Sequence, residues 1–388
     1  MNTCCSANSR HAPTYDLIVV GAGSAGFAAP ITAAEKGGRV ALIGGGTIGG
    51  TCVNVGCVPS KTLIRAAESL HKATAAARFA GISAQGKVFD WAATVRQKGE
   101  LVASLRKSKY TDLLKAYEGI SYLEGQARLV PGGVEVDGER LSSARIVIAT
   151  GARSAVPDIP GIEMVPYLTS TTALELAELP RSMIVVGGGY IGAELAQLFA
   201  RAGVAVPPVC RSPPLSRAEP GSNHAPARDL GGQGGTGVRG IAYRSVRKDD
   251  LGVALKVSHQ GEETTLSAER LLVAVGRMPN TEALGLVEMD IELSSAGGIM
   301  VDDRMRTTAP GVFAAGDVTG RDQFVYMAAY GAKLAAMNAL NGDTARYDNT
   351  AMPAVVFTDP QLASVGLTEA QARHAGHDVR TSVLSLDN

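Results

Sequence analysis

The sequence of 388 residues has few cysteines, few aromatic residues and no excess of charge of either sign. There are only five cysteines, and in a chain without a secretory signal a close pair of them is more often catalytic or metal-binding than a structural disulfide. Trp91 is the only tryptophan. Lys plus Arg and Asp plus Glu both number 37, so no overall field favours nucleic acid or an anionic membrane. No segment offers about 18 consecutive apolar residues, and the N-terminus lacks the apolar run of a secretory signal. We therefore expect a cytoplasmic protein without nucleic-acid or membrane partners.

Glycine, in contrast, is abundant, with 46 residues, and two glycine-rich turns each follow a short apolar strand pattern. The first turn carries Gly21, Gly23 and Gly26, and the second carries Gly187, Gly189 and Gly192. A strand, a turn of this spacing and a helix, in that order, aim backbone N–H groups at a pyrophosphate. The repeat predicts two dinucleotide sites in an α/β fold of two Rossmann-like, doubly wound domains. The alternative is the same fold with tight turns and no ligand.

Further apolar strand patterns end in residues suited to a ligand or to a domain crossing. In the patterns at 144–151 and 271–277 an apolar strand runs into a glycine, Gly151 and Gly276, as at crossings between two domains. The pattern at 310–317 ends at Asp317, whose carboxylate is placed to accept hydrogen bonds from a polyol or ribose. The alternative for Asp317 is an ordinary turn or N-cap aspartate.

Two of the cysteines, Cys52 and Cys57, lie five residues apart in the stretch GGTCVNVGCVPSK. In a regular helix, Cα atoms five residues apart are separated by roughly 8 to 9 Å, whereas a disulfide needs about 4.4 to 6.8 Å. A bonded pair therefore predicts a break in the helix at Gly56, with a helix restarting from Pro59. A zinc site would need two more ligands, and His71 is the only neighbour in sequence. Beside two dinucleotide sites, the pair favours an electron relay, and two thiolates also suit soft metal ions.

The motifs GAGSAG, GGTCVNVGCVPSK, GGGYIGAE, VFAAGD and AMPAVVFTDPQLASVG are spread over most of residues 15–388. Together they resemble the flavoprotein disulfide reductases, which include glutathione reductase, dihydrolipoamide dehydrogenase and mercuric reductase. The stretches TSTTALEL at 169–176 and GRDQFVYMAA from 320 favour the mercuric reductase branch. The resemblance implies that FAD and NADPH are the cofactors.

The same resemblance implies a role for individual residues. Cys52 is the interchange thiol, Cys57 faces the flavin, and the two hold Hg(II) as a thiolate complex for reduction to Hg(0). Lys61 and Glu194 form an ion pair near the flavin and nicotinamide, and Tyr190 covers the nicotinamide pocket. The residues implied in cofactor binding are Gly21, Gly23, Gly26, Gly50, Thr51, Lys61, Thr150, Gly151, Gly187, Gly189, Gly192, Arg211, Gly276 and Asp317.

Taken one at a time, three of these residues have plainer interpretations. Lys61 could be a solvated helix lysine, and Glu194 could be a first-turn acid favoured by the helix dipole. Tyr190 could belong to the core. The joint pattern favours the functional interpretation over these.

The sequence departs from the family pattern in three internal places. Gly44 stands where an acid that binds ribose is expected at the end of the second strand, which predicts weaker FAD binding. Pro30 falls inside the first helix, where a proline costs about 3 kcal/mol. Residues 207–240 are rich in proline and glycine, so we expect them to be irregular and to weaken the NADPH domain.

The resemblance also sets the expected domain boundaries. A flexible tail spans 1–14, the FAD domain 15–152 and 277–348, the NADPH domain 153–276, and the start of an α+β dimerisation domain 349–388. The family forms homodimers through that last domain, and here it is expected to be truncated at Asn388. Cys4 and Cys5 are expected to be an incidental pair on the tail, with metal collection as the alternative.

Three functions remain open at this point. The favoured one is NADPH-dependent reduction of Hg(II) through FAD and the cysteine pair. The first alternative is a disulfide reductase similar to dihydrolipoamide dehydrogenase or glutathione reductase. The second is an inactive, truncated thiol protein that binds flavin or metal.

Overall fold

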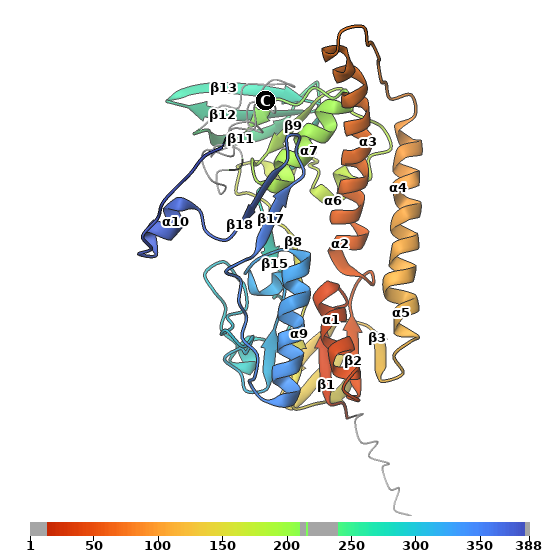
Figure 1. The fold of residues 1–388 in the computed structure, drawn as a ribbon, viewed down its shortest axis with the longest axis vertical. Helices are drawn as coiled ribbons and strands as arrows, with labels where there is room; N and C mark the ends of the chain where they lie inside the picture. Colours follow the sequence, from red (N-terminus) through yellow and green to blue (C-terminus); the bar gives the residue numbers. More distant parts are fainter. Residues whose placement is uncertain (1–13, 210–214, 216–239, 385–388) are drawn as a thin grey trace, which may run out of the picture. The chain divides into compact units, whose positions relative to one another are not determined.

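The computed structural model describes residues 14–209, 215 and 240–384 (Figure 1). Its internal contacts divide the chain into two compact units, each assembled from three separate segments. Unit 1 comprises Met1–Asn54, Ala103–Arg153 and Met278–Tyr347, and unit 2 comprises Val55–Val102, Ser154–Arg277 and Asp348–Asn388. The chain passes between the units five times: after Asn54, within helix α4 (Trp91–Arg106), within strands β8 (Ala152–Ser154) and β15 (Arg277–Pro279), and after Tyr347.

Unit 1 is built on a five-stranded sheet with the order β16-β7-β1-β2-β3, in which every neighbouring pair is parallel. Its strands are β1 (Leu17–Val20), β2 (Val40–Gly44), β3 (Ile120–Glu124), β7 (Ile146–Ile148) and β16 (Val312–Ala314). Strands β1, β2, β7 and β16 are almost entirely buried, which is typical of continuous apolar runs in a parallel sheet. These runs agree with the strands expected from the sequence.

The two faces of this sheet are covered by different layers. Helices α1 (Ser24–Ala34) and α9 (Val325–Asn341) cover one face, where Leu17, Val19 and Leu42 pack against small helix residues (Figure 1). An antiparallel sheet of β4 (Ala127–Val130), β5 (Gly133–Val136) and β6 (Glu139–Ser142) covers the other, around Ile18 and Ile43. The alternation of Leu17, Ile18 and Val19 between layers follows from the two-residue period of a strand.

Unit 2 repeats this layering around a smaller parallel sheet, β10-β9-β14. The strands are β9 (Met183–Val186), β10 (Pro208–Val209) and β14 (Arg270–Val273). Helices α3 (Cys57–Ala75), α6 (Ser170–Ala173) and α7 (Tyr190–Arg201), with the first part of α4, form one apolar cluster with this sheet. Strands β11 (Ala242–Lys248), β12 (Val253–His259) and β13 (Glu262–Ala268) form an antiparallel sheet that packs on the other face.

The remaining regular elements are short. They are α2 (Gly50–Asn54), α5 (Asp112–Leu114), β17 (Pro353–Val356), β18 (Leu362–Val365) and α10 (Glu369–His374), with a π-helical turn at Lys107–Thr111. Strands β17 and β18 form an antiparallel pair.

The structure bears on two of the sequence expectations. Pro30 lies inside helix α1, as the sequence indicated, and it is buried there. Within the stretch expected to be irregular, Pro208 and Val209 form strand β10, paired in parallel with β9. They lie at the edge of the sheet, where a missing ladder donor is tolerated. Most of residues 207–240, like Cys4, Cys5 and the rest of the tail, lie outside the described residues.

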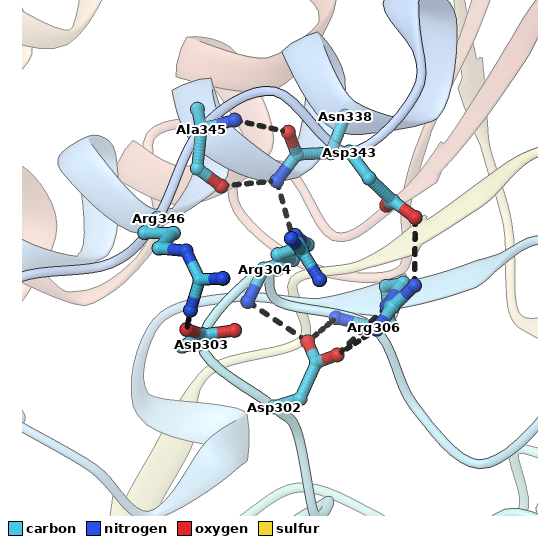
Figure 2. A network of polar contacts seen from close by, with 8 residues as sticks. All are labelled: Asp302, Asp303, Arg304, Arg306, Asn338, Asp343, Ala345 and Arg346. Atoms are coloured by element: carbon cyan, nitrogen blue, oxygen red, sulfur yellow. Dashed lines mark hydrogen bonds and ion pairs between the residues drawn. The ribbon is translucent and has the colours of Figure 1, made fainter.

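A polar network fastens the far end of α9 to the loop before β16 (Figure 2). The carboxylate of Asp302 accepts hydrogen bonds from the backbone N–H groups of Arg304 and Arg306 at 2.8 and 3.0 Å. The Arg306 guanidinium bonds Asp302 at 2.6 Å and Asp343 at 2.7 Å. The Asn338 amide of α9 donates to the carbonyl of Arg304 at 2.9 Å. The network fixes α9, one of the two helices that cover the sheet of unit 1.

Candidate functional site

The first glycine turn of unit 1 has room only for glycine at two of its three positions. Gly21 has φ +115°, and a Cβ there would lie 2.2 Å from the carbonyl oxygen of Ala149. A Cβ at Gly26 would lie 1.7 Å from the carbonyl oxygen of Gly21. The backbone of Gly23 is the N-cap of α1, and no side chain caps that helix end. Bare backbone and uncapped N–H groups fit a pyrophosphate at this turn.

The second glycine turn, in unit 2, repeats this geometry. Gly187 has φ +116°, and a Cβ there would lie 2.3 Å from the carbonyl oxygen of Ala274. A Cβ at Gly192 would lie 2.0 Å from the carbonyl oxygen of Gly187. A Cβ at Gly189, the N-cap of α7, would have no protein atom within 4 Å. The space over this helix end is therefore left clear, as the second dinucleotide site requires.

Other residues expected at the FAD site lie around the first turn. Gly50 has φ +62°, and a Cβ there would lie 2.6 Å from Cα of Gly23, so the start of α2 touches the turn. Thr51 follows in α2 with its side chain exposed. The hydroxyl of Thr150 donates to the carbonyl of Asn280 at 2.7 Å, which fixes the strand end next to the turn.

Asp317 and Gly151 complete this set in unit 1. Asp317 follows β16 and is half-buried. The preceding residue, Gly316, has a positive φ, and a Cβ there would contact Ala25 of α1 at 3.2 Å and Ala328 of α9 at 3.1 Å. Gly151, with φ +72°, accepts a hydrogen bond from the N–H of Asn280 at 3.0 Å. Asp317 and Gly151 thus follow β16 and β7, two adjacent strands of this parallel sheet.

The two cysteines lie on successive helices. Cys52 is half-buried in α2, and Cys57 is exposed at the first position of α3. The helix breaks at Val55 and Gly56, which confirms the predicted interruption. Helix α3 begins at Cys57, two residues before the predicted restart, because Pro59 is tolerated throughout the first turn of a helix.

Asn54 holds α2 in place within unit 1. Its side chain is buried, and its amide donates to the carbonyls of Ile48 and Gly50 at 2.9 and 2.8 Å. Its Oδ1 accepts a hydrogen bond from the Arg106 guanidinium at 3.1 Å. The helix that carries Cys52 is therefore anchored on both sides. No local sequence pattern marks this role, because the partners of Asn54 are up to 52 residues away.

Lys61 and Glu194 form the ion pair that was expected from the sequence. Nζ of Lys61 lies 2.6 Å from Oε2 of Glu194, which is 5% exposed. The other carboxylate oxygen accepts a hydrogen bond from the backbone N–H of Phe357 at 2.9 Å. The Phe357 ring also lies 4.9 Å from Nζ of Lys61, within the range of a cation–π contact. Phe357 was not among the predicted site residues, although its motif was.

Two more side chains on the same face of α7 form hydrogen bonds and an ion pair with Asp359. The side-chain amide of Gln197 donates to the carbonyl of Asp359 at 2.9 Å and accepts from its N–H at 2.7 Å. The buried guanidinium of Arg201 bonds the Asp359 carboxylate at 2.9 Å. Glu194, Gln197 and Arg201 are spaced three and four residues apart and therefore share one side of the helix. This row holds residues 357–359 along α7.

The remaining predicted residues have less defined surroundings. Tyr190 opens α7, is half-buried and packs beside the cluster of Ala193, Val356 and Leu362. Gly276 has φ +129°, and its carbonyl accepts a hydrogen bond from the N–H of Ala155 at 2.9 Å. Arg211 lies outside the described residues.

The described residues contain neither a ready-made metal cluster nor a membrane-spanning helix. No group of three or more His, Cys, Asp or Glu side chains there is arranged to hold a metal ion. In the same part of the chain, no helix has the length and apolar content needed to cross a membrane.

Comparison with known proteins places these features in a family. Residues 15–336 match the family described as pyridine nucleotide-disulphide oxidoreductase, and residues 352–388 match its dimerisation domain. The chain is 41% identical to a mercuric reductase of Staphylococcus aureus over 96% of its length, covering 68% of that protein. It is 44% identical to a mercuric reductase of Streptomyces lividans, covering 96% of the chain and 80% of that protein.

A third relative and a solved structure give the same result. The chain is 42% identical to a mercuric reductase of Bacillus cereus over 98% of its length, but it spans only 60% of that protein. The HOCl-induced flavoprotein disulfide reductase RclA from Escherichia coli, solved as a Cu(II) complex, superposes with a TM-score of 0.81. It is 31% identical, and the match covers 94% of this chain and 80% of the other. The two glycine turns, the cysteine motif and these matches agree: the chain belongs to the pyridine nucleotide-disulphide oxidoreductases, and its cofactors are FAD and NADPH.

Proposed function

We propose that this chain carries the NADPH-dependent reduction of Hg(II) to Hg(0), with Cys52 and Cys57 as the redox pair and the metal-binding thiols. The observation that carries the proposal is the position of α2. Gly50, its first residue, lies against Gly23 of the first glycine turn, and Cys52 follows two residues later. A thiol on this short helix is therefore held next to the FAD-binding turn.

FAD would be held in unit 1 by the turn Gly21–Gly26 together with Gly50, Thr51, Thr150, Gly151 and Asp317. NADPH would be held in unit 2 by the turn Gly187–Gly192 and Gly276, with Arg211 for its 2′-phosphate. When bound, FAD passes electron pairs from NADPH to the thiol pair. We assign the domain boundaries as expected from the sequence, with 15–152 and 277–348 as the FAD domain and 153–276 as the NADPH domain.

The thiols supply the metal chemistry. Two thiolates prefer a soft ion such as Hg(II) to harder ions, because sulfur ligands match soft metals. The metal would be bound as a dithiolate, and two electrons from NADPH would convert Hg(II) to Hg(0), with NADP⁺ and a proton as the other products. Sulfur holds the neutral atom poorly, so the product leaves.

Lys61, Glu194 and Tyr190 would prepare the site for electron transfer. The Lys61 ammonium is held by Glu194 and faces Phe357, which fixes the position of its positive charge. This charge would lie near the reacting rings when the cofactors are bound. Tyr190, at the start of α7, would cover the nicotinamide pocket. We further propose a homodimer formed through residues 352–388, and a cytoplasmic location, where thiols stay reduced.

The names of the relatives favour mercury over a disulfide substrate, since those at 36 to 44% identity are mercuric reductases. The test is to load the purified chain with FAD and follow NADPH oxidation with Hg(II), oxidised glutathione or lipoamide as acceptor, while trapping mercury vapour. We expect oxidation and vapour with Hg(II) alone. Oxidation with either disulfide and no vapour would support the disulfide reductase alternative. No oxidation with any acceptor would support an inactive thiol protein.

A further inference from the structure

The end of β2 lacks the acidic side chain that a dinucleotide site of this kind normally has. In such sites a carboxylate about 20 residues beyond the glycine turn bonds the ribose hydroxyls. Gly44 ends β2 here, and Gly45 and Gly46 follow. A Cβ at Gly44 would lie 2.9 Å from Cβ of Ala22, so this position still borders the first turn.

The space beside Gly44 is filled by a side chain from the neighbouring strand. A Cβ at Gly44 would lie 2.6 Å from Oη of Tyr122 and 3.0 Å from its ring. Tyr122 belongs to β3, which pairs in parallel with β2 so that Leu42 lies opposite Tyr122. An acid at position 44 could not be accommodated without displacing this tyrosine. The phenol hydroxyl therefore stands beside the place of the missing carboxylate.

A carboxylate lies one strand farther along the sheet. Glu124, the last residue of β3, is the register partner of Gly44 and is exposed. It lies two residues after Tyr122, so both side chains leave the strand on the same face. Burial, and then the negative charge of Glu124, raise the pKa of Tyr122, which agrees with a carboxylate near the phenol. Among the described residues, the Glu124 carboxylate forms no hydrogen bond or ion pair.

We propose that Tyr122 and Glu124 replace the absent carboxylate of β2 and bind the 2′- and 3′-hydroxyls of the adenosine ribose of FAD. A carboxylate accepts hydrogen bonds from two adjacent hydroxyls, and a phenol both donates and accepts. The replacement moves the acceptor from the end of β2 to the end of the neighbouring strand β3. The inference rests on the proposed function, because it requires FAD at the first turn.

The test measures the affinity of the FAD-free chain for FAD and for an FAD analogue whose adenosine ribose lacks both hydroxyls, by quenching of flavin fluorescence. Hydrogen bonds to a charged group predict a preference for FAD of about tenfold to a hundredfold in the unsubstituted chain. Glu124→Gln should weaken FAD binding by a similar factor and leave the analogue unchanged, so the preference disappears. Tyr122→Phe should reduce the preference by a smaller factor.

The matched control is Glu135→Gln, an exposed acid on β5 of the same unit, which should keep the full preference. Because each variant is compared with itself on two ligands, a general effect on folding cannot imitate the result. A Glu124→Gln variant that keeps the full preference overturns the inference and leaves the proposed function standing. A chain that binds FAD through Glu124 but does not reduce Hg(II) overturns the proposed function and leaves this inference standing.

Discussion

Nζ of Lys61 and Oε2 of Glu194 lie 2.6 Å apart, although 133 positions separate the two residues in the sequence. Lys61 is on the helix that begins at Cys57, and Glu194 is on the helix that begins at the second glycine turn. The carboxylate is almost fully buried and is held from its other side by the N–H of Phe357. The pair thus ties the helix of one cysteine to the helix of the nucleotide turn within unit 2.

Replacing Glu194 should slow the reduction of the flavin by NADPH. Glu194→Gln keeps an oxygen to accept the Phe357 N–H but removes the charge that holds the Lys61 ammonium. Loss of a hydrogen bond between charged groups costs about 1.5 to 3 kcal/mol, so we expect the rate of flavin reduction to fall by about tenfold to a hundredfold. Stopped-flow absorbance of the flavin measures this rate.

The control is Glu68→Gln on α3, the helix of Lys61, where Glu68 pairs with the exposed side chains of Arg65 and Lys72. That variant should reduce at the unsubstituted rate. Equal rates for Glu68→Gln and Glu194→Gln would show that the buried pair has no part in the reaction.

The Phe357 ring should contribute separately from its backbone. Phe357→Leu keeps the N–H that bonds Glu194 and removes the aromatic face 4.9 Å from the Lys61 ammonium. A cation–π contact at a partly exposed site is worth about 0.5 to 1 kcal/mol, which predicts flavin reduction two- to fivefold slower. Phe357→Tyr should restore the rate. An undiminished rate in Phe357→Leu would show that the ring does not contribute to flavin reduction.

Two glycines of the second turn should separate folding from nucleotide binding. Gly192→Ala places a Cβ 2.0 Å from the carbonyl of Gly187, and we expect it to lower the free energy of unfolding by about 2 to 3 kcal/mol in urea titrations. Gly189→Ala meets no protein atom within 4 Å, so its stability should change by less than about 1 kcal/mol. Its NADPH affinity should nevertheless fall at least tenfold, because the methyl group enters the space left for the pyrophosphate. Unchanged NADPH binding in Gly189→Ala would place the nucleotide elsewhere.

The network of Figure 2 should make the stability of unit 1 depend on pH. Burial alone would raise the pKa of Asp302, but the N–H donors of Arg306 and Arg304 and the Arg306 guanidinium outweigh it and lower the pKa. The stabilisation is therefore present above the ordinary aspartate pKa of about 3.9 and is lost as the pH falls through the lower folded value.

Asp302→Asn should lower the free energy of unfolding by about 1 kcal/mol at pH 7, since the side chains are partly exposed and screened. The difference from the unsubstituted chain should shrink below about pH 4. Asp303→Asn, whose partner Arg346 is exposed, should have a smaller effect. Urea titrations at pH 7 and below pH 4 measure both, and a difference that did not vary with pH would refute the linkage.

Much of the fold followed from local sequence signals. The strands before both glycine turns, the helices after them and the break at Gly56 lie where the patterns indicated, because apolar runs and glycine positions act within a few residues. The antiparallel layers β4–β6 and β11–β13 were not predicted, since their strands alternate weakly and mix polar with apolar residues.

The sequence motifs identified the candidate site, but they did not identify the residues that hold it in place. Asn54, Phe357 and Asp359 act on partners between 52 and 163 residues away, and no local pattern marks such contacts. The three glycines after Ile43 indicated a lost acid, but only the strand register shows that Tyr122 occupies the space. From the sequence alone we predicted weaker FAD binding, and only the structure shows that Tyr122 lies beside Gly44 and that Glu124 is its register partner.

The central claim is that Cys52 and Cys57 form the redox pair, with Cys57 toward the flavin. The most direct measurement adds NADPH to the FAD-loaded chain without oxygen and records the long-wavelength absorption of a thiolate lying against flavin, before and after one equivalent of Hg(II). We predict that NADPH makes the band form in the unsubstituted chain and that Hg(II) then discharges it. In Cys52→Ser, where Cys57 has no disulfide partner, the band should already be present before NADPH is added, and in Cys57→Ser it should be absent throughout. A band that persists unchanged in Cys57→Ser would contradict this claim.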